Sequence, residues 1–472
     1  MIDTDRVARL IDTKKERFFA VADRIWELAE TRWEEHQSMA AQIESIGNEG
    51  FRIETGIAGI PTAFVAEAGT DGPVIAILGE YDALAGLSQE DGLAAPQQAA
   101  RNTSGHGHGC GHNLLGTAGL MAAVAVKDYL AANGLPGRVR YYGCPAEEGG
   151  SAKTFMVREG VFADVDAALS WHPGSYNALM NGDSLANIQV YFRFKGRASH
   201  AAAAPHLGRS ALDAVGLMSA GVNYMREHMP SDARIHYAYT DMGGVAPNVV
   251  QATSAVLYLI RARDLTTMNA LFERVKKIAE GAALMTETTV EVEVDKACSN
   301  MLGNDPLERA MQANLDALGA PPFDAADHAA AARFHATVTN EEIESGAKRF
   351  GVPVEKGAVL HNGVVPMSEQ RPFMSGSTDV GDVSWAVPTA QVWTACYTFG
   401  TPGHSWQLTG QGRLPAAHKG MTQAAKIMAA TAVDALLDPA LLAKAKADHA
   451  ARTAATPYVC PIPEGVVPPC SR

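Results

Sequence analysis

Apolar residues recur along the chain in two periods, one typical of helices and one typical of buried strands. From about residue 7 to residue 46, the apolar positions follow helical spacing. Residues 73–78, Pro-Val-Ile-Ala-Ile-Leu, are nearly all apolar, as expected of a strand buried on both faces of a mostly parallel sheet. Strands and helices then alternate, which predicts an α/β fold. The predicted strands are 62–66, 138–143 and 167–171, and the predicted helices are 114–132 and 152–159.

The pattern changes at about residue 186. Up to residue 298 the predicted order is strand, helix, strand, strand, helix, strand, which is the order of ferredoxin-like α+β domains. These elements lie at about 188–194, 209–228, 235–240, 254–263, 266–285 and 289–294. We therefore expect residues 186–298 to form a domain inserted between two parts of the α/β domain, 1–185 and 299–472.

The second part of the α/β domain is less regular. A helix at 306–318, a strand at 390–399 and a helix at 416–437 are predicted. The stretch 320–372 has no assignable pattern, and we expect the Pro-rich tail, 456–472, to be extended.

Composition and charge exclude several classes of partner. The chain has 472 residues, 47% of them hydrophobic, and a formal net charge of −13. This length suits two or three domains, and the negative charge argues against nonspecific binding of nucleic acid or an anionic membrane. The amino terminus lacks the layout of a signal peptide, and the apolar run 118–126 is too short to span a bilayer. Six scattered Cys without a CxxC pair indicate reduced thiols, so we expect a cytoplasmic location.

A loop rich in His and Cys carries the first candidate metal ligands. Residues 105–113 read Gly-His-Gly-His-Gly-Cys-Gly-His-Asn. Thiolate suits Zn²⁺ and imidazole suits most divalent first-row metals, and Cys110 and His112 flank a single glycine. We interpret His106 and His108 as lying outside the ligand set or in solvent.

A pair of adjacent carboxylates follows another predicted strand. Residues 145–150 read Pro-Ala-Glu-Glu-Gly-Gly, and the two glycines permit a turn that aims both side chains inward. Glu148 and Glu147 point in different directions, so one can bind a metal while the other takes a proton from a water that the metal acidifies.

Further candidates follow other predicted strands. Glu80 and Asp82 follow one strand, and His172 and His404 follow two more. Ligands bind beyond the carboxyl ends of strands in open α/β sheets. If these segments converge, the chain is a metal-dependent hydrolase, and we favour both His residues as ligands.

Several short motifs occur in a fixed order along the chain. They are Gly79–Leu84, Cys110–His112, Pro145–Gly150, Trp171–Pro173, Ser199–Ala202 and the region of His404. As an ordered set, they resemble the M20 metallopeptidase/amidohydrolase family, and most closely its aminoacylase-like branch. The resemblance implies a mostly parallel-sheet catalytic domain with an inserted ferredoxin-like domain that serves as a lid and for dimerisation.

The resemblance also implies two divalent metal ions per chain, Zn²⁺ or Mn²⁺. By this resemblance, Cys110 bridges the two ions. Glu148 and His404 complete one site, and His112 and His172 complete the other.

Four more residues receive roles from the resemblance. Glu147 is the implied general base, and His200 is implied to reach a neighbouring protomer's active site and stabilise the oxyanion. Asn248 is implied to contact substrate, and Arg261 to pair with the free carboxylate of the substrate. Without the resemblance, His200 would be interpreted as a surface residue and Arg261 as a strand-end residue.

The acidic residues around these motifs are not all assigned. Glu80 stands where many family members carry His, and its role is open. Asp82 can support the site from outside the ligand set. For at least one of Asp379 and Asp382, helix N-capping is the simplest interpretation.

The expected reaction is hydrolysis of the amide bond between an aryl or other acyl group and an amino acid with a free carboxylate. Among glutamate and aspartate conjugates, p-aminobenzoyl-glutamate is the first candidate. The alternatives are a dipeptidase for unusual dipeptides, a noncatalytic partner subunit of a hetero-oligomer, and a metal-storage protein. The expected assembly is a homodimer through the lid or a heteromer with a paralogous subunit.

Overall fold

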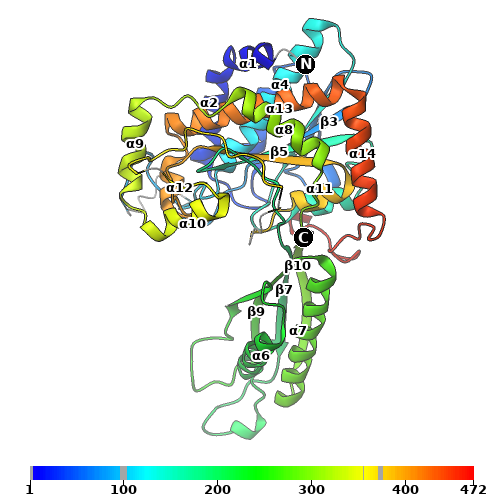
Figure 1. Ribbon diagram of the computed structural model, residues 1–472. Coiled ribbons are helices and arrows are strands. Elements are labelled where there is room, and N and C mark those ends of the chain that lie inside the picture. Colours follow the sequence, from blue (N-terminus) through cyan, green and yellow to red (C-terminus); the bar gives the residue numbers. More distant parts are fainter. Residues whose placement is uncertain are drawn as a thin grey trace.

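Two β-sheets organise the described part of the chain, one with seven strands and one with four. The computed structural model describes residues 4–95, 102, 104–354, 356–369, 371 and 376–471. The larger sheet and most helices form one body, and the smaller sheet with α6 and α7 extends away from it (Figure 1).

The seven-stranded sheet has the order β1-β2-β4-β3-β5-β11-β6. Its four central strands, β4, β3, β5 and β11, are parallel, and the outer pairings are antiparallel. The central strand β3 is buried at all seven positions because it is apolar on both faces. The strand bounds are β1 Arg52–Thr55, β2 Phe64–Ala68, β3 Val74–Glu80, β4 Arg138–Cys144, β5 Ala167–Gly174, β6 Ala178–Leu179 and β11 Thr389–Ala395.

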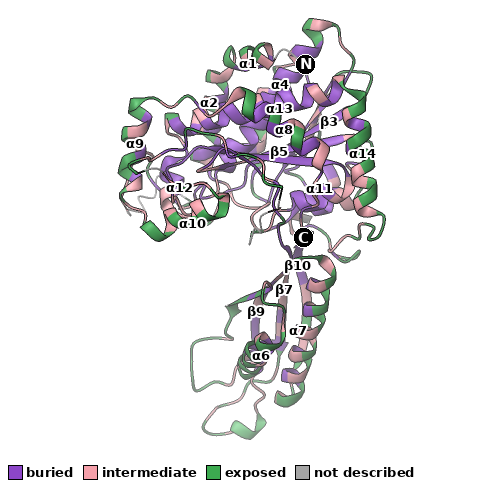
Figure 2. Ribbon diagram, in the orientation of Figure 1, coloured by how far each residue is buried: buried purple, intermediate pink, exposed green. Residues whose placement is uncertain are grey.

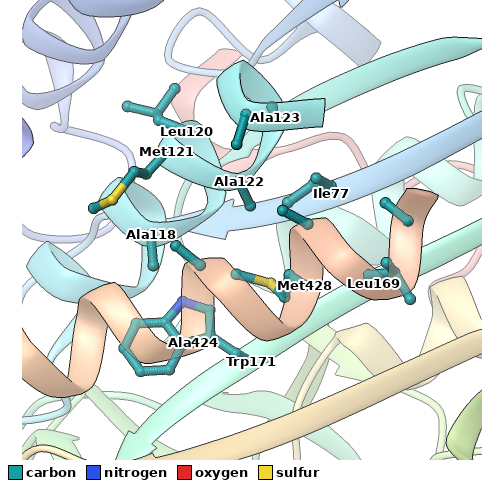
Figure 3. Packing of buried hydrophobic residues seen from close by; sticks show 14 of the residues in the cluster. Ile77, Ala118, Leu120, Met121, Ala122, Ala123, Leu169, Trp171, Ala424 and Met428 are labelled. Atoms are coloured by element: carbon teal, nitrogen blue, oxygen red, sulfur yellow. The ribbon is translucent and has the colours of Figure 1, made fainter. Parts of the chain in front are cut away.

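Helices cover both faces of this sheet. Small side chains of α4 and α13 let these two helices approach each other and the sheet closely (Figure 3). In that layer, Ala118 and Met428 pack with Leu169 and Trp171 of β5. The bounds are α1 Thr4–Asp12, α2 Lys15–Leu28, α3 His36–Gly47, α4 His112–Asn133, α5 Ala152–Arg158, α8 Asp305–Leu318, α9 Ala325–His335, α10 Asn340–Phe350, α11 Val380–Ala386, α12 Trp406–Gln411, α13 Pro415–Leu437 and α14 Pro439–Thr453.

Helix α4 also has the length and composition of a membrane-crossing segment. It has 22 residues and a mean hydropathy of 1.4 in its most apolar window. Within the described residues it is the one helix of this kind, and 83% of that window is buried inside the protein, as in the core helix of a folded domain.

The four-stranded sheet forms the lid, by which we mean the elements from β7 to β10. All of its pairings are antiparallel, and the order β10-β7-β9-β8 is the ferredoxin-like arrangement. The bounds are β7 Ala186–Lys195, α6 Ala211–Met225, β8 Arg234–Asp241, β9 Thr253–Ala262, α7 Leu265–Thr286 and β10 Thr289–Cys298. The expected fold class is therefore confirmed, whereas the division at residues 186 and 298 stays a prediction.

Two helices occupy the stretch that had no assignable pattern, 320–372. Both α9 and α10 begin with a capping box, closed by Asp324 with Asp327 and by Thr339 with Glu342. Residues 355, 370 and 372 of this stretch lie outside the described residues. The tail has no strand within its described part and ends in a 3₁₀ turn, Pro469–Ser471, while Arg472 lies outside the described residues.

Candidate metal centre

The candidate ligands meet at one edge of the seven-stranded sheet. Cys110 and His112 stand at the start of α4, and Glu148 follows β4. His172 lies within β5, and His404 follows β11. Since β4, β5 and β11 run parallel, their carboxyl ends lie at the same edge, which is where α/β sheets place their sites.

Two groups of three side chains share Cys110. One group joins Cys110 with His112 and His172, and the other joins it with Glu148 and His404. Within each group, one potential ligand atom per residue lies within 4.8 Å of the others. The Sγ atom of Cys110 lies 3.4 Å from Nε2 of His172, and Nε2 of His404 lies 3.3 Å from Oε2 of Glu148. The fold thus brings together all five residues that the sequence predicted as ligands.

The glycine between Cys110 and His112 is required by this geometry. Gly111 has a φ of +84°, which L side chains rarely adopt. An added Cβ would lie 2.2 Å from the Tyr397 hydroxyl oxygen and 2.8 Å from Cγ of Pro173. A side chain at this position would therefore displace the segments that hold the neighbouring ligands.

Neighbouring groups orient the imidazoles. Nδ1 of His112 donates to Oδ1 of Asp82 at 2.9 Å, and Oδ2 of Asp82 accepts from the backbone N–H of Glu148, also at 2.9 Å. Nδ1 of His172 donates to the Pro173 carbonyl at 2.8 Å. Hydrogen bonds of this kind fix the tautomer and leave Nε2 of each ring available to a metal.

Two buried polar atoms of the centre lack hydrogen-bond partners among the described residues. They are Oε1 of Glu148 and Nε2 of His112, and the latter lies 3.2 Å from Oε2 of Glu80 without a hydrogen bond to it. Buried polar atoms are rarely left unpaired because each one costs about 1–3 kcal/mol. A thiolate, imidazoles and a carboxylate are ligands that divalent first-row metals accept, so the residues fit divalent metal ions.

The charges around Cys110 favour the anionic forms that bind metals. Burial and Glu148 raise the pKa of Cys110, but His172 and His112 outweigh them and bring it down to about 6. Burial also raises the pKa of Glu148, but the hydrogen bond from His404 and the charge of His112 hold it at about 2. Hydrogen bonds to Cys110 and Glu148 raise the pKa of His404 to about 10.

Glu147 belongs to a third group of side chains beside these two. Its carboxylate, Glu80 and His112 lie within 4.8 Å of one another. Burial, followed by the charges of Glu80 and Glu148, raises the pKa of Glu147 well above its ordinary value. A carboxylate with a raised pKa is suited to accepting a proton and passing it on near neutral pH.

Lys153 is a buried residue of the centre that the sequence reasoning missed. Its Nζ atom lies 2.6 Å from Oε1 of Glu80 and 2.6 Å from Oδ1 of Asp379, and the side chains are 0%, 3% and 0% exposed. The ammonium group compensates two carboxylates that would otherwise be buried unpaired. The available signal was a lone Lys in the otherwise uncharged stretch Ala152–Val157, directly after the two glycines.

The expected capping of a helix by at least one of Asp379 and Asp382 is met in position only, since neither side chain makes a capping hydrogen bond. Asp379 stands at the N-cap of α11 without a side-chain capping bond, because its carboxylate binds Lys153. Asp382 lies inside α11 and accepts hydrogen bonds from Thr154, Ser299 and Tyr458. Both carboxylates thus hold neighbouring segments together, which no local pattern in the sequence indicates.

Two of the three candidate residues of the lid, His200 and Asn248, lie on its surface. His200 and Asn248 are exposed and sit on adjacent loops, where the N–H of Ala201 donates to the Asn248 carbonyl at 3.0 Å. Nδ1 of His200 accepts from two backbone N–H groups of its own loop. Arg261, on β9, donates through Nη1 to Oγ of Ser377 at 3.0 Å. In the described part of the chain, no recorded bond joins His200 or Asn248 to the five candidate ligands.

His106 and His108 fall outside both groups that contain Cys110. His108 is buried, and its Nε2 donates to the Ile25 carbonyl at 3.0 Å. Nδ1 of His106 accepts from the N–H of Gly86 at 3.4 Å. These residues therefore shape the loop that carries Cys110.

A family model accounts for most of the chain. Residues 76–409 match the model of peptidase family M20/M25/M40. The chain belongs to this family. The expected family and the expected enzyme class, a hydrolase of amide bonds, are thereby confirmed.

Known members of the family resemble the M20 chain over nearly its whole length. It is 50% identical over 468 residues to a subunit of the p-aminobenzoyl-glutamate hydrolase of Escherichia coli (strain K12), which is 97% of each chain. It is 30% identical over 452 residues to the Xaa-Arg dipeptidase of Mus musculus, covering 93% of this chain and 90% of that one. A dinuclear metal binding peptidase of the M20 family from Bacillus subtilis shares the fold, with a TM-score of 0.54 and 17% identity over 90% of this chain and 99% of that one.

Proposed function

We propose that this M20 hydrolase cleaves the amide bond of N-aroyl amino acids, with p-aminobenzoyl-glutamate as the first candidate substrate. The observation that carries the proposal is the convergence of four ligand-type side chains on Cys110, with Glu147 beside them. The identity of 50% to a p-aminobenzoyl-glutamate hydrolase subunit supports this choice of substrate.

Two divalent ions, Zn²⁺ or Mn²⁺, would be held by the two groups that share Cys110. Cys110 is the proposed bridging ligand, Glu148 and His404 complete one site, and His112 and His172 complete the other. The thiolate favours Zn²⁺, whereas imidazole and carboxylate also accept Mn²⁺. Ions bound there would supply Lewis acidity, which makes a water molecule more acidic and polarises an amide carbonyl.

Glu147 is the proposed general base. It takes a proton from the attacking water and then gives that proton to the leaving amine. The raised pKa of Glu147 supports this role, since a carboxylate with a higher pKa is a stronger base toward the attacking water.

The lid supplies the proposed substrate contacts. Arg261 would pair with the free carboxylate of the substrate, and its charge already interacts with Glu147. His200 would donate to the developing oxyanion, and Asn248 would contact the substrate. Because His200 and Asn248 are exposed and have no recorded bond to the candidate ligands in the described structure, we assign these two roles to the lid of a second chain.

The free edge of the lid sheet supports a dimer. Strand β8 is the edge strand and is exposed at seven of its eight positions. Tyr237 and Tyr239 on this strand are 37% and 42% exposed, and Met242, directly after it, is 54% exposed. An unpaired edge with apolar side chains is suited to pairing with a second lid.

The second lid belongs to a copy of this chain or to a paralogous subunit. The second possibility is supported by the E. coli relative, which is one subunit of its hydrolase. We place the assembly in the cytoplasm, in keeping with the free thiols.

The test is hydrolysis of p-aminobenzoyl-glutamate by the purified chain loaded with Zn²⁺ or Mn²⁺, beside Glu147→Gln loaded to the same metal content. We expect activity in the native chain and its loss in the variant. Two bound metals with no activity on this substrate would contradict the proposal.

A dipeptidase is the second candidate, because the chain is 30% identical to an Xaa-Arg dipeptidase over nearly its full length. A dipeptide ending in Arg, assayed beside p-aminobenzoyl-glutamate, separates the two functions. Activity that appears only after a paralogous chain is added would instead favour the noncatalytic subunit.

A further inference from the structure

A pocket of about 700 Å³ opens directly beside the candidate metal centre. At one end it is lined by Cys110, His172 and His404, and at the other by residues of α10. The motifs gave no role to α10, which belongs to the stretch that the sequence pattern left unassigned. The pocket therefore has the candidate metal ligands and helix α10 in the same lining, and α10 has no assigned role.

Aromatic side chains hold α10 against the sheet and form much of the pocket wall. The ring of Phe350 packs against Tyr176, with centroids 4.4 Å apart, and against Trp393 of β11 at 4.8 Å. All three residues line the pocket. A planar ring entering the pocket would therefore meet other rings, an arrangement that favours stacked and edge-on contacts.

A cation lies over the same wall. The guanidinium carbon of Arg349 is 4.3 Å from the centroid of Trp393 and 5.7 Å from that of Phe350. In the described part of the chain, no carboxylate forms an ion pair with Arg349. The pocket-lining Glu342 uses Oε2 to accept from the backbone and hydroxyl of Thr339. Glu341 lines the same pocket, so its charge is mixed, but the guanidinium of Arg349 keeps a flat face that is suited to an aromatic partner.

The position of Glu147 indicates which half of the substrate enters this pocket. Among the described residues, Glu147 lies with Glu80 and His112, outside the pocket lining, and its charge interacts with that of Arg261. A general base that returns its proton to the leaving amine must face the amine half of the substrate. The acyl half therefore lies on the other side of the scissile bond, towards Cys110 and His404.

We propose that this pocket is the acyl-group pocket and that Arg349 is a specificity-determining residue for planar aromatic acyl groups. This proposal rests on the proposed function. The ring of an aroyl group would lie on the outer face of the Arg349 guanidinium, because the other face already lies over Trp393 at 4.3 Å. The charge of Arg349 is less favourable to the free α-ammonium of a dipeptide than a neutral side chain would be, so Arg349 favours N-aroyl amino acids over dipeptides.

The first arm of the test is kinetic and uses three substrates that share the leaving glutamate: p-aminobenzoyl-glutamate, acetyl-glutamate and alanyl-glutamate. The metal-loaded full chain is compared with Arg349→Met and with Lys348→Met. Lys348 is an exposed cation on the same helix outside the described pocket lining, so it controls for charge and helix stability. For Arg349→Met we expect kcat/KM to fall about tenfold for p-aminobenzoyl-glutamate, to stay within about twofold for acetyl-glutamate, and to rise for alanyl-glutamate. An equal change for all three substrates, or the same change in Lys348→Met, would overturn the proposal.

The second arm measures binding and does not depend on turnover. Isothermal titration compares p-aminobenzoate with acetate, which share the carboxylate and differ in the ring. We expect p-aminobenzoate to bind at least about tenfold more tightly, and Arg349→Met to remove most of that difference while Lys348→Met keeps it. Equal binding of both anions to the native chain would overturn the pocket assignment. Preferential binding of p-aminobenzoate without hydrolysis of any substrate would leave the pocket standing and would refute only the proposed function.

Discussion

The metal centre and the lid differ in whether the candidate residues of a single chain come together. Those of the centre do, whereas in the described structure His200 and Asn248 of the lid do not reach them. In the centre, five candidate ligands from four separate segments come together around Cys110, and hydrogen bonds to Asp82 and Pro173 orient two of them. In the lid, His200 and Asn248 lie on exposed loops and bond mainly to their own backbone. Figure 2 shows the same contrast on a larger scale, with a buried core around β3 and β5 and broad exposed surfaces on the lid.

The difference indicates two kinds of preorganisation. The centre is built on the ends of rigid parallel strands, so it exists before any ligand arrives. The roles proposed for the lid residues require a lid to meet an active site, so their contribution would depend on movement or on assembly. Substitutions in the centre should therefore change metal binding, stability or the reaction itself, whereas substitutions in the lid should change activity alone.

The largest effect is expected at Glu147. Glu147→Gln removes the proposed base and keeps the size of the side chain, so kcat should fall by about 10²–10⁴-fold. Metal content, measured by elemental analysis, should stay the same. Glu159→Gln, an exposed Glu after α5, is the control and should keep full activity. A variant that loses its metal as well would show that Glu147 is a ligand.

Lys153 tests how far burial stabilises the centre. Lys153→Met leaves Glu80 and Asp379 buried without their counter-ion, so the free energy of unfolding should fall by about 3–5 kcal/mol. Urea unfolding of the metal-free chain measures this loss. Lys446→Met, which removes an exposed ion pair with Asp166, should cost at most about 1 kcal/mol. If both variants lost the same free energy of unfolding, the buried ion pairs of Lys153 would contribute no more to stability than an exposed ion pair.

His200 tests whether the lid acts in a second chain. His200→Ala should lower kcat by about 10²–10³-fold without changing stability or metal content, because one oxyanion donor is lost. His206→Ala, on the same exposed segment, should be neutral.

Mixing the inactive variants sharpens the same prediction. In a mixed dimer of His200→Ala with Glu147→Gln, one active site has both a native base and a native lid His. Activity should therefore return after the two proteins are unfolded and refolded together. If His200 serves the site of its own chain, the mixture stays as inactive as its parts.

A substitution of Asp82 tests whether its hydrogen bond to His112 contributes to metal affinity. Asp82→Asn weakens the hydrogen bond that orients His112, so metal affinity should fall about 10–100-fold while the fold is retained. Competition with a chelator measures this affinity. The matched control is Asp23→Asn, since Asp23 contacts His418 at the same distance of 2.9 Å. A loss of affinity in the control would point to a general effect of charge.

The smallest expected effect is a pH dependence of stability that arises from Asp382, at the junction between the α/β body and the lid. Asp382 accepts from Ser299, just beyond the lid strand β10, and burial raises its pKa to about 6. The folded state therefore binds this proton more tightly than the unfolded state, whose pKa is about 3.9. The resulting stability, at most about 3 kcal/mol, is present below about pH 4 and is lost as the pH rises through about 6.

Urea unfolding of the metal-free chain between pH 4 and pH 7 measures this slope. It should be weaker in Asp382→Asn and unchanged in Asp183→Asn, which alters an exposed carboxylate. A slope that is the same in both variants would assign it to other groups.

Much of the fold could be predicted because local pattern and burial agree. The continuous apolar run of β3 and the ferredoxin-like order of the lid both follow from the sequence. The strand predicted at 390–399 ends at Ala395, because the following residues turn into the loop that carries His404. Helix α10 was missed because its polar sequence buries no residue fully and depends on Phe350 packing against Tyr176 and Trp393.

The sequence by itself determined which residues are candidates for the chemistry of this chain. Cys110, His112, Glu147 and Glu148 stand in motifs that, as an ordered set, are specific enough to indicate the family without a structure. Only the tertiary structure decided the partners of buried charges and the wall of the pocket. Lys153 binds Asp379, which lies 226 residues away in the sequence. Arg349 of α10 contacts Trp393 of β11. Such contacts form when segments that are distant in the sequence are buried against each other. The local hydrophobic pattern of either segment does not indicate which segment it will meet.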